Sequence, residues 1–179
     1  MVGEKDTAYG RFERNQKFAA AVEQLRGDRK DIYPVRVDVI PGNGHTGLPD
    51  RDIIKQMYPA VRNPVPTELS WLQTDKVIRD FFWLRSEAPG KKREIEATCR
   101  DNRIAITTST NVTSATVLLD SRLIDFDQPV ITEVNGTKSS HKLQPSLRVL
   151  AETLLRRGDP ELAFTAKIEL PITAPASDK

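Results

Sequence analysis

Residues 93–108 read Arg-Glu-Ile-Glu-Ala-Thr-Cys-Arg-Asp-Asn-Arg-Ile-Ala-Ile-Thr-Thr. Apolar and polar residues alternate on both sides of the Asp101-Asn102 pair, as expected for strands with one buried face. Asp and Asn favour turns because their side chains bond to the local backbone. We therefore predict strands at 93–100 and 103–108, and an ordinary structural position for the single cysteine, Cys99.

A similar sequence pattern continues on both sides of this hairpin and extends through the C-terminal part of the chain. Short β-type runs alternate with turn residues, and Asn135-Gly136 is a favoured hairpin dipeptide. We predict a mostly antiparallel, sandwich-like module. Its further strands are expected at 67–72, 76–84, 115–119, 130–134 and 165–170.

One helix is predicted inside this β-rich part, from about 146 to 157, with Gly158 as its stop. Its apolar residues recur at helical spacing and form a stripe, so we expect the helix to pack on the sheet. The stripe consists of Leu147, Leu150, Ala151, Leu154 and Leu155.

The N-terminal part has a different pattern of helix, strand and helix. A helix is predicted from Tyr9 to Arg26, a β-branched strand over 32–40, and a second helix from Pro49-Asp50 onward. The prolines at 64 and 66 cannot continue that second helix. We place the domain division there, giving residues 1–65 and 66–179.

Composition limits the classes of function. The 179 residues carry 27 Lys and Arg against 25 Asp and Glu, and the signs are interspersed, so nothing indicates nucleic acid as a partner. No apolar run approaches the roughly 20 residues of a membrane span. The first residues contain no secretory signal pattern, so the sequence does not indicate a localisation.

A glycine-rich loop, Gly42-Asn43-Gly44-His45-Thr46-Gly47, follows the predicted strand, and Asp6 precedes the first helix. The order acid, helix, strand, histidine brings two neighbouring strand ends of a parallel sheet together. A carboxylate that accepts from Nδ1–H of a histidine fixes the tautomer of a general base. We predict that Asp6 and His45 form one site; the alternative is a surface histidine and an aspartate that caps a helix.

These residues resemble the last part of an α/β-hydrolase, especially the esterases and prolyl-oligopeptidase-like serine hydrolases. In that family a Gly-x-x-Asp turn, here Gly3 to Asp6, is followed by a helix, a strand and a Gly-His loop. The resemblance implies that Asp6 is the triad acid and His45 the general base. It also implies that Asp50 starts the final helix of the catalytic fold.

The rest of the chain is similar to one subgroup of large, exported bacterial hydrolases that carry a β-rich C-terminal extension. The likeness runs through 37–84 and through the tail segments 117–119, 125–130 and 134–136. The expected fold class is therefore mixed α+β: a helix–strand–helix remnant of a hydrolase sheet followed by the β-sandwich-like module with one packed helix.

The family's nucleophile motif, Gly-x-Ser-x-Gly, does not occur in these residues. We therefore expect a serine hydrolase fragment for ester or peptide-like substrates that has acid and base but no nucleophile and is inactive by itself. No cofactor is expected. Nor is a metal, since Asp50 and Asp52 near His45 are explained by helix capping and the helix dipole.

The alternative is a non-catalytic binding or assembly module for carbohydrate or a protein partner. A carbohydrate platform would use the aromatic residues Trp71, Phe81, Phe82 and Trp83, which otherwise serve as core packing. His141 lies in a polar stretch and is predicted to be non-catalytic. Sheet edges left open by missing neighbours favour a homo-oligomer.

Overall fold

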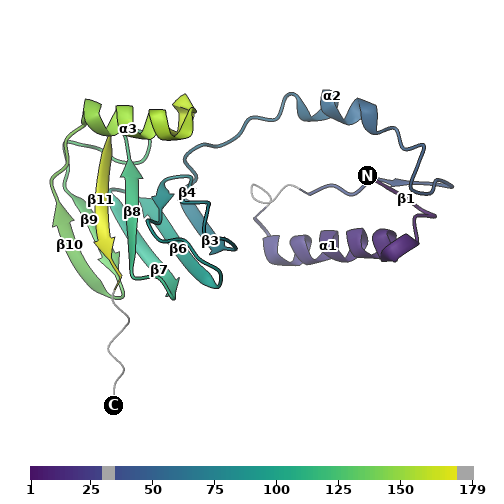
Figure 1. The fold of residues 1–179 in the computed structure, drawn as a ribbon, viewed down its shortest axis with the longest axis horizontal. Helices are drawn as coiled ribbons and strands as arrows, with labels where there is room; N and C mark the ends of the chain where they lie inside the picture. Colours follow the sequence, from purple (N-terminus) through teal and green to yellow (C-terminus); the bar gives the residue numbers. More distant parts are fainter. Residues whose placement is uncertain (30–34, 173–179) are drawn as a thin grey trace, which may run out of the picture. The chain divides into compact units, whose positions relative to one another are not determined.

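The computed structural model describes residues 1–29 and 35–172 (Figure 1). The chain forms two compact units, residues 1–61 and 62–179. The sequence prediction placed the division after residue 65. Within the described residues the fold is mixed α+β, with three α-helices and mostly antiparallel sheets.

The first unit is built around a pair of two-residue parallel strands, β1 (Val2–Gly3) and β2 (Val39–Ile40). The predicted strand over 32–40 is therefore wrong in length: residues 35–38 are not in a strand, and 32–34 lie outside the described residues. Among the described strands, β2 pairs with β1 alone. A β-branched run needs a neighbouring strand to hydrogen-bond along its whole length, and β1 supplies two residues.

The helices of this unit connect and follow the two strands. A 3-10 turn, η1 (Ala8–Gly10), leads into α1 (Arg11–Arg26), which ends at Gly27 as predicted. A second 3-10 turn, η2 (Asp50–Asp52), leads into α2 (Ile53–Met57). Neither helix contains a buried residue, so both leave apolar side chains exposed.

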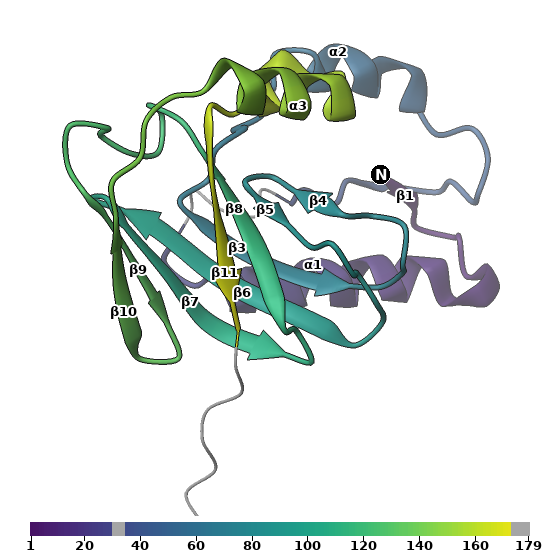
Figure 2. The same ribbon diagram turned by 60° about the vertical axis from the view of Figure 1, so that its left-hand side comes forward.

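The second unit contains two sheets (Figure 2), in the orders β10-β9-β7-β6-β3 and β11-β8-β5-β4. All neighbours are antiparallel except β7 and β9, because the chain passes through β8 of the other sheet between them. The strands are β3 (Glu68–Gln73), β4 (Asp80–Phe81), β5 (Leu84–Arg85), β6 (Arg93–Arg100), β7 (Arg103–Thr110), β8 (Ser114–Leu119), β9 (Val130–Val134), β10 (Thr137–His141) and β11 (Ala166–Pro171).

Most predicted strands of this unit are found, but one prediction is wrong and one strand was missed. The predicted run 76–84 is not one strand, because the chain reverses at Phe82, whose φ is 50°, between β4 and β5. The polar strand β10 was not predicted. In the part of the chain that the structure describes, it pairs with β9 alone, through the Asn135-Gly136 turn, and an edge strand needs no apolar face.

The core of the second unit lies between the two sheets. Trp83 and Phe164 are fully buried in it, and Trp71 of β3 stacks on Phe81 of β4 at 5.7 Å, joining the sheets at one end. Other buried members come from nearly every strand. They include Ile95, Ala97, Cys99, Ile104, Ile106, Val117, Leu119, Val130, Ile168 and Leu170.

The predicted helix is α3 (Leu147–Arg157), capped by Ser146 and ended by Gly158, whose φ is 63°. Its predicted packing face is wrong: Leu147 is 84% exposed and Leu155 86% exposed. The helix instead turns Thr153 inward. The Thr153 hydroxyl oxygen accepts from the N–H of Phe164 at 2.9 Å and lies 3.1 Å from the C=O of Phe164, and this contact fixes which face of α3 meets the sheets.

Candidate functional site

The turn that carries Asp6 is held beside the glycine-rich loop by backbone hydrogen bonds. The N–H of Glu4 donates to the C=O of Ile40 at 3.0 Å, and the N–H of Lys5 donates to the C=O of Asn43 at 2.8 Å. Gly3 permits this approach, since a Cβ there would lie 2.1 Å from the carbonyl oxygen of Gly44. The sequence Gly3 to Asp6 and the loop at 42–47 are therefore one structural feature.

Asp6 and His45, which the sequence analysis predicted as one site, lie together. The Oδ2 of Asp6 is 3.1 Å from the Nδ1 of His45. The side chain of Asp6 is 4% exposed, whereas that of His45 is 67% exposed. A buried carboxylate thus orients an imidazole that solvent or a substrate can reach.

Arg11 is a third member of this site, which the sequence analysis missed. Its Nη1 donates to Oδ1 of Asp6 at 2.9 Å, so the two carboxylate oxygens have different partners. The sequence contained a signal for this contact. An arginine at the first position of a helix is repelled by the positive end of the helix dipole, so a nearby carboxylate partner is expected.

The charge state of Asp6 follows from these contacts. Burial by itself would raise the pKa of Asp6, but the hydrogen bonds from Arg11 and His45, together with their charges, outweigh burial and lower this pKa. Asp6 is therefore a carboxylate at neutral pH and acts as the acceptor for Nδ1–H of His45.

The arrangement leaves the other ring nitrogen of His45 available. Within the described residues Nε2 of His45 has no hydrogen-bond partner, and an ionised acceptor at Nδ1 makes Nε2 the basic nitrogen. Residues 1–61 contain no serine and no cysteine. The first unit by itself therefore offers a base without a serine or cysteine nucleophile.

Other predicted positions lie apart from this chemistry. Asp50 and Asp52 are in η2, and the described residues contain no group of three or more His, Cys, Asp or Glu side chains that could hold a metal. His141 is on the edge strand β10, with Nε2 2.9 Å from Oγ1 of Thr132.

Cys99 occupies the buried strand position predicted for it, which is confirmed, and burial raises the pKa of its thiol to about 11. The aromatic platform is contradicted, because Trp71 and Trp83 are both buried. Trp83 donates from Nε1 to the carbonyl of Pro66 at 2.6 Å, so it ties the start of the second unit to the core.

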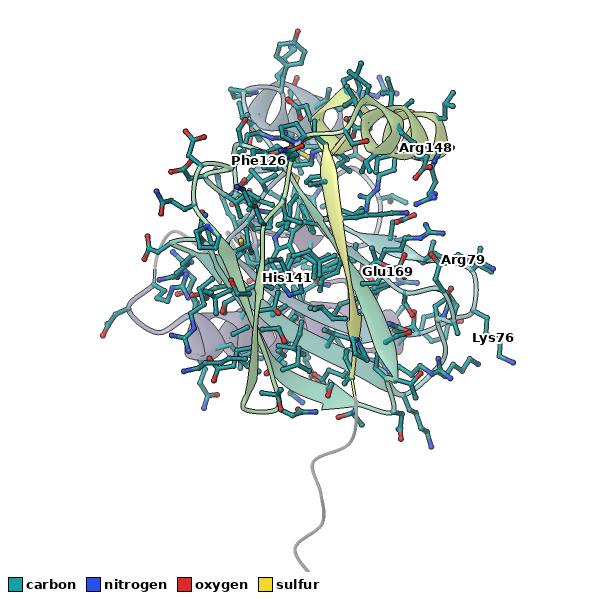
Figure 3. The ribbon with its side chains drawn as sticks, turned by 90° about the vertical axis from the view of Figure 1, so that its left-hand side faces the viewer. Lys76, Arg79, Phe126, His141, Arg148 and Glu169 are labelled. Atoms are coloured by element: carbon teal, nitrogen blue, oxygen red, sulfur yellow. The ribbon has the colours of Figure 1, made fainter. Side chains whose placement is uncertain are left out.

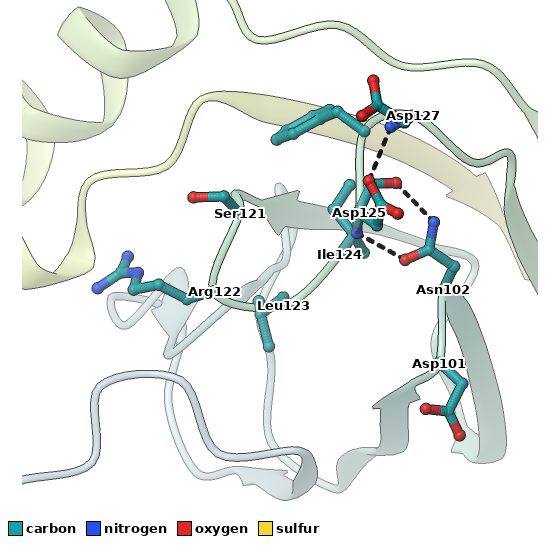
Figure 4. Close-up of a pocket in the computed structure, with 9 residues that line it drawn as sticks. Asp101, Asn102, Ser121, Arg122, Leu123, Ile124, Asp125 and Asp127 are labelled. Atoms are coloured by element: carbon teal, nitrogen blue, oxygen red, sulfur yellow. Dashed lines mark hydrogen bonds between the residues drawn. The ribbon is translucent and has the colours of Figure 1, made fainter.

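Figure 4 shows an open hollow beside the β6–β7 turn, lined by Asp101, Asn102, Asp125 and their neighbours. Its polar side chains form hydrogen bonds with the backbone of the loop. The Asn102 side chain donates to the carbonyl of Asp125 at 2.6 Å and accepts from the N–H of Asp125 at 2.7 Å. These groups hold the backbone in place, so the hollow presents no assembled chemistry.

A second hollow lies between the loop after β3 and the end of α3, lined by Arg79, Arg85 and Arg156 among others. Lys76 and Arg79 project outward from this region (Figure 3). Arg85 is the buried cation there, and its Nη1 donates to both carboxylate oxygens of Asp80 at 3.1 Å. Arg85 also pairs with Glu87, and Asp80 also contacts Arg157, so the charged groups here already have partners within the unit.

Comparisons with protein-family models, curated proteins and solved structures gave no match to the chain. Among the described residues, no helix is both long and apolar enough to cross a bilayer.

Proposed function

We propose that Asp6 and His45 are the acid and the general base of a serine hydrolase for ester or peptide-like substrates, and that its nucleophile lies outside these 179 residues. The observation that carries the proposal is the 3.1 Å contact between a buried carboxylate and Nδ1 of an exposed imidazole. Supporting it are the parallel β1–β2 pair and the Gly-x-x-Asp turn, both typical of the final part of an α/β-hydrolase sheet.

The chemistry assigned to the pair is proton transfer. His45 would accept the serine proton at Nε2 as the hydroxyl attacks the substrate carbonyl, and Asp6 would stabilise the imidazolium through Nδ1–H. Arg11 keeps Asp6 ionised, and its positive charge also weakens the pull of Asp6 on the imidazolium. Arg11 is thus a positioning residue for the carboxylate.

The proposal predicts that the chain of residues 1–179 does not hydrolyse p-nitrophenyl acetate above the buffer rate, since a base without a nucleophile has nothing to activate. Because an exposed imidazole attacks activated esters by itself, turnover would contradict the proposal if both His45→Ala and the substitution of one serine or threonine of the chain abolished it.

The decisive experiment uses the reading frame that precedes the codon for Met1. We expect an extended polypeptide that contains Gly-x-Ser-x-Gly and hydrolyses the ester, with kcat reduced on the order of 10³-fold or more by His45→Ala. His141→Ala is the matched control and should retain activity. An extended frame without the motif, or full activity in the His45→Ala variant, would reject the assignment.

A second function, a non-catalytic assembly module, is favoured by one observation: Leu147 and Leu155 on α3 are almost fully exposed. This function does not exclude the first, because the two use different units of the chain.

A further inference from the structure

The loop that carries His45 has few backbone hydrogen bonds. Counting partners in the described ranges 1–29 and 35–172, the backbone N–H groups of residues 44–47 donate to no acceptor, and of their carbonyl oxygens that of Gly47 alone is bonded. Its donor is the side-chain Nδ2 of Asn43, at 2.8 Å. The path of the backbone on both sides of His45 therefore depends on one side-chain contact.

Gly47 has a backbone conformation that suits this contact. Its φ is 77°, in the left-handed region that residues with a side chain rarely adopt. A Cβ at this position would also lie 3.3 Å from Nδ2 of Asn43, which is tighter than ordinary van der Waals contact. The glycine and the Asn43 amide are therefore matched, and together they close the loop of residues 43–47 with His45 at its middle.

Asn43 also contacts the turn that carries the acid. Its carbonyl oxygen accepts from the N–H of Lys5, the residue directly before Asp6, at 2.8 Å. Asn43 thus joins the two segments of the candidate site. Its backbone is bonded to the turn of Asp6, and its side chain is bonded to the far end of the loop that carries His45.

We propose that Asn43 is a positioning residue that holds the His45 imidazole beside Asp6; its part in proton transfer rests on the proposed function. Ordering a loop costs conformational entropy. The imidazole is 67% exposed, so without Asn43 its hydrogen bond with Asp6 would have to offset that cost alone. A general base acts efficiently only when it is held within about 0.5 Å of the productive geometry.

The test records the tautomer of His45 by nitrogen-15 NMR of the full chain, in alkaline solution where imidazoles are neutral. The contact with Asp6 favours the Nδ1–H tautomer, because the hydrogen bond at one ring nitrogen decides where the proton resides. In Asn43→Ala we expect the ratio of Nδ1–H to Nε2–H to fall about 2- to 12-fold, the effect of losing one net hydrogen bond.

Two further variants define the contact. Gly47→Ala should also lower the ratio, since its Cβ disturbs the Asn43 amide from the other side. Asn15→Ala is the matched control: Nδ2 of Asn15 donates to the carbonyl of Arg11 at 2.8 Å, so this variant loses a bond of the same kind in the same unit. Its tautomer ratio should equal that of the parent chain.

Amide hydrogen exchange separates positioning from a general loss of structure. The N–H of Lys5 should stay protected in Asn43→Ala, because its acceptor is the backbone carbonyl of residue 43. Loss of that protection, an unchanged tautomer ratio in Asn43→Ala, or an equal decrease in Asn15→Ala would overturn the proposal. The imidazole itself is the readout and needs no nucleophile, so the result is independent of the upstream reading frame that tests the proposed function.

Discussion

At the scale of single residues, the carboxylate of Asp6 contacts both other members of the candidate site, Arg11 and His45. Asp6 accepts from Arg11 on one oxygen and from His45 on the other while its side chain is almost fully buried. Burial disfavours the ionised form of Asp6, whereas Arg11 and His45 favour it. Their effect is larger, so the pKa of Asp6 is lowered. The position of His45 therefore depends on Asp6 remaining ionised.

The variant Arg11→Gln tests this balance. It removes one of the two donors that lower the pKa of Asp6, so we expect this pKa to rise and the contact with His45 to be lost at a higher pH during acidification. Carbon-13 NMR titration of the Asp6 carboxyl measures the shift. Arg14→Gln on the same helix, where the described residues provide no ion-pair partner, should leave the titration unchanged.

The same pKa determines the acid stability of the first unit. Folded Asp6 binds a proton less readily than unfolded Asp6, so its contribution to stability is present above the ordinary aspartate pKa. That contribution is lost as the pH falls through the lowered folded pKa. Arg11→Gln should bring the folded pKa of Asp6 closer to its unfolded value, so the stabilising contribution becomes smaller and is lost at a higher pH. Acid unfolding followed by circular dichroism would detect this change.

Gly3 tests whether the approach of the two loops creates the site. Gly3→Ala would place a Cβ 2.1 Å from the carbonyl oxygen of Gly44, so the loops must separate. We expect the first unit to lose at least about 2 kcal/mol of unfolding free energy in urea. Gly44→Ala meets nothing within 4 Å and should change it by less than about 1 kcal/mol. Equal effects of the two substitutions would contradict the loop contact.

At the scale of elements, α3 shows how one buried hydroxyl overrides an apolar pattern. The stripe of leucines predicted a packed face, yet the helix meets its unit through Thr153. Local periodicity reports which side of a helix is apolar. It does not report which side finds hydrogen-bond partners on another segment, here the backbone of Phe164.

Thr153→Val keeps the size of this side chain and removes its hydroxyl. The N–H of Phe164 then loses its acceptor in a buried place, at a cost of about 1–3 kcal/mol in the unfolding free energy from urea titration. Thr153→Ser retains the oxygen and should lose less than half as much. A Val variant as stable as the parent would show that this hydroxyl does not hold α3.

At the scale of the whole molecule, the two units differ in how much apolar surface they bury. The second unit has a continuous core between two sheets, whereas the helices of the first unit have no buried residue. Burial of apolar surface is the main stabilising term in folding. The second unit therefore has what it needs to fold independently.

We predict that residues 62–179 alone unfold cooperatively in urea with nearly the same midpoint as in the full chain. Cys99 provides the readout, because its thiol is buried and its pKa is raised to about 11. It should not react with a thiol reagent at pH 8 until the fragment unfolds. Rapid labelling of Cys99 in the native fragment would show that the second unit needs the first.

The sequence by itself determined the local features whose causes lie within a few residues. The alternation at 93–108, the Asn135-Gly136 turn and the stop of α1 at Gly27 all appear in the structure, because turn chemistry and side-chain periodicity are local. The pairing of Asp6 with His45 was also predictable, from their order around a helix and a strand.

Only the tertiary structure decided the features that depend on a distant partner. The strand at 39–40 is short because β1 offers two residues to pair with, and Arg11 joins Asp6 because the turn folds back on the helix. The outward face of α3 follows from a backbone segment eleven residues away. Long-range pairing selects among conformations that the local sequence equally permits, and that is why these features could not be predicted from patterns along the chain.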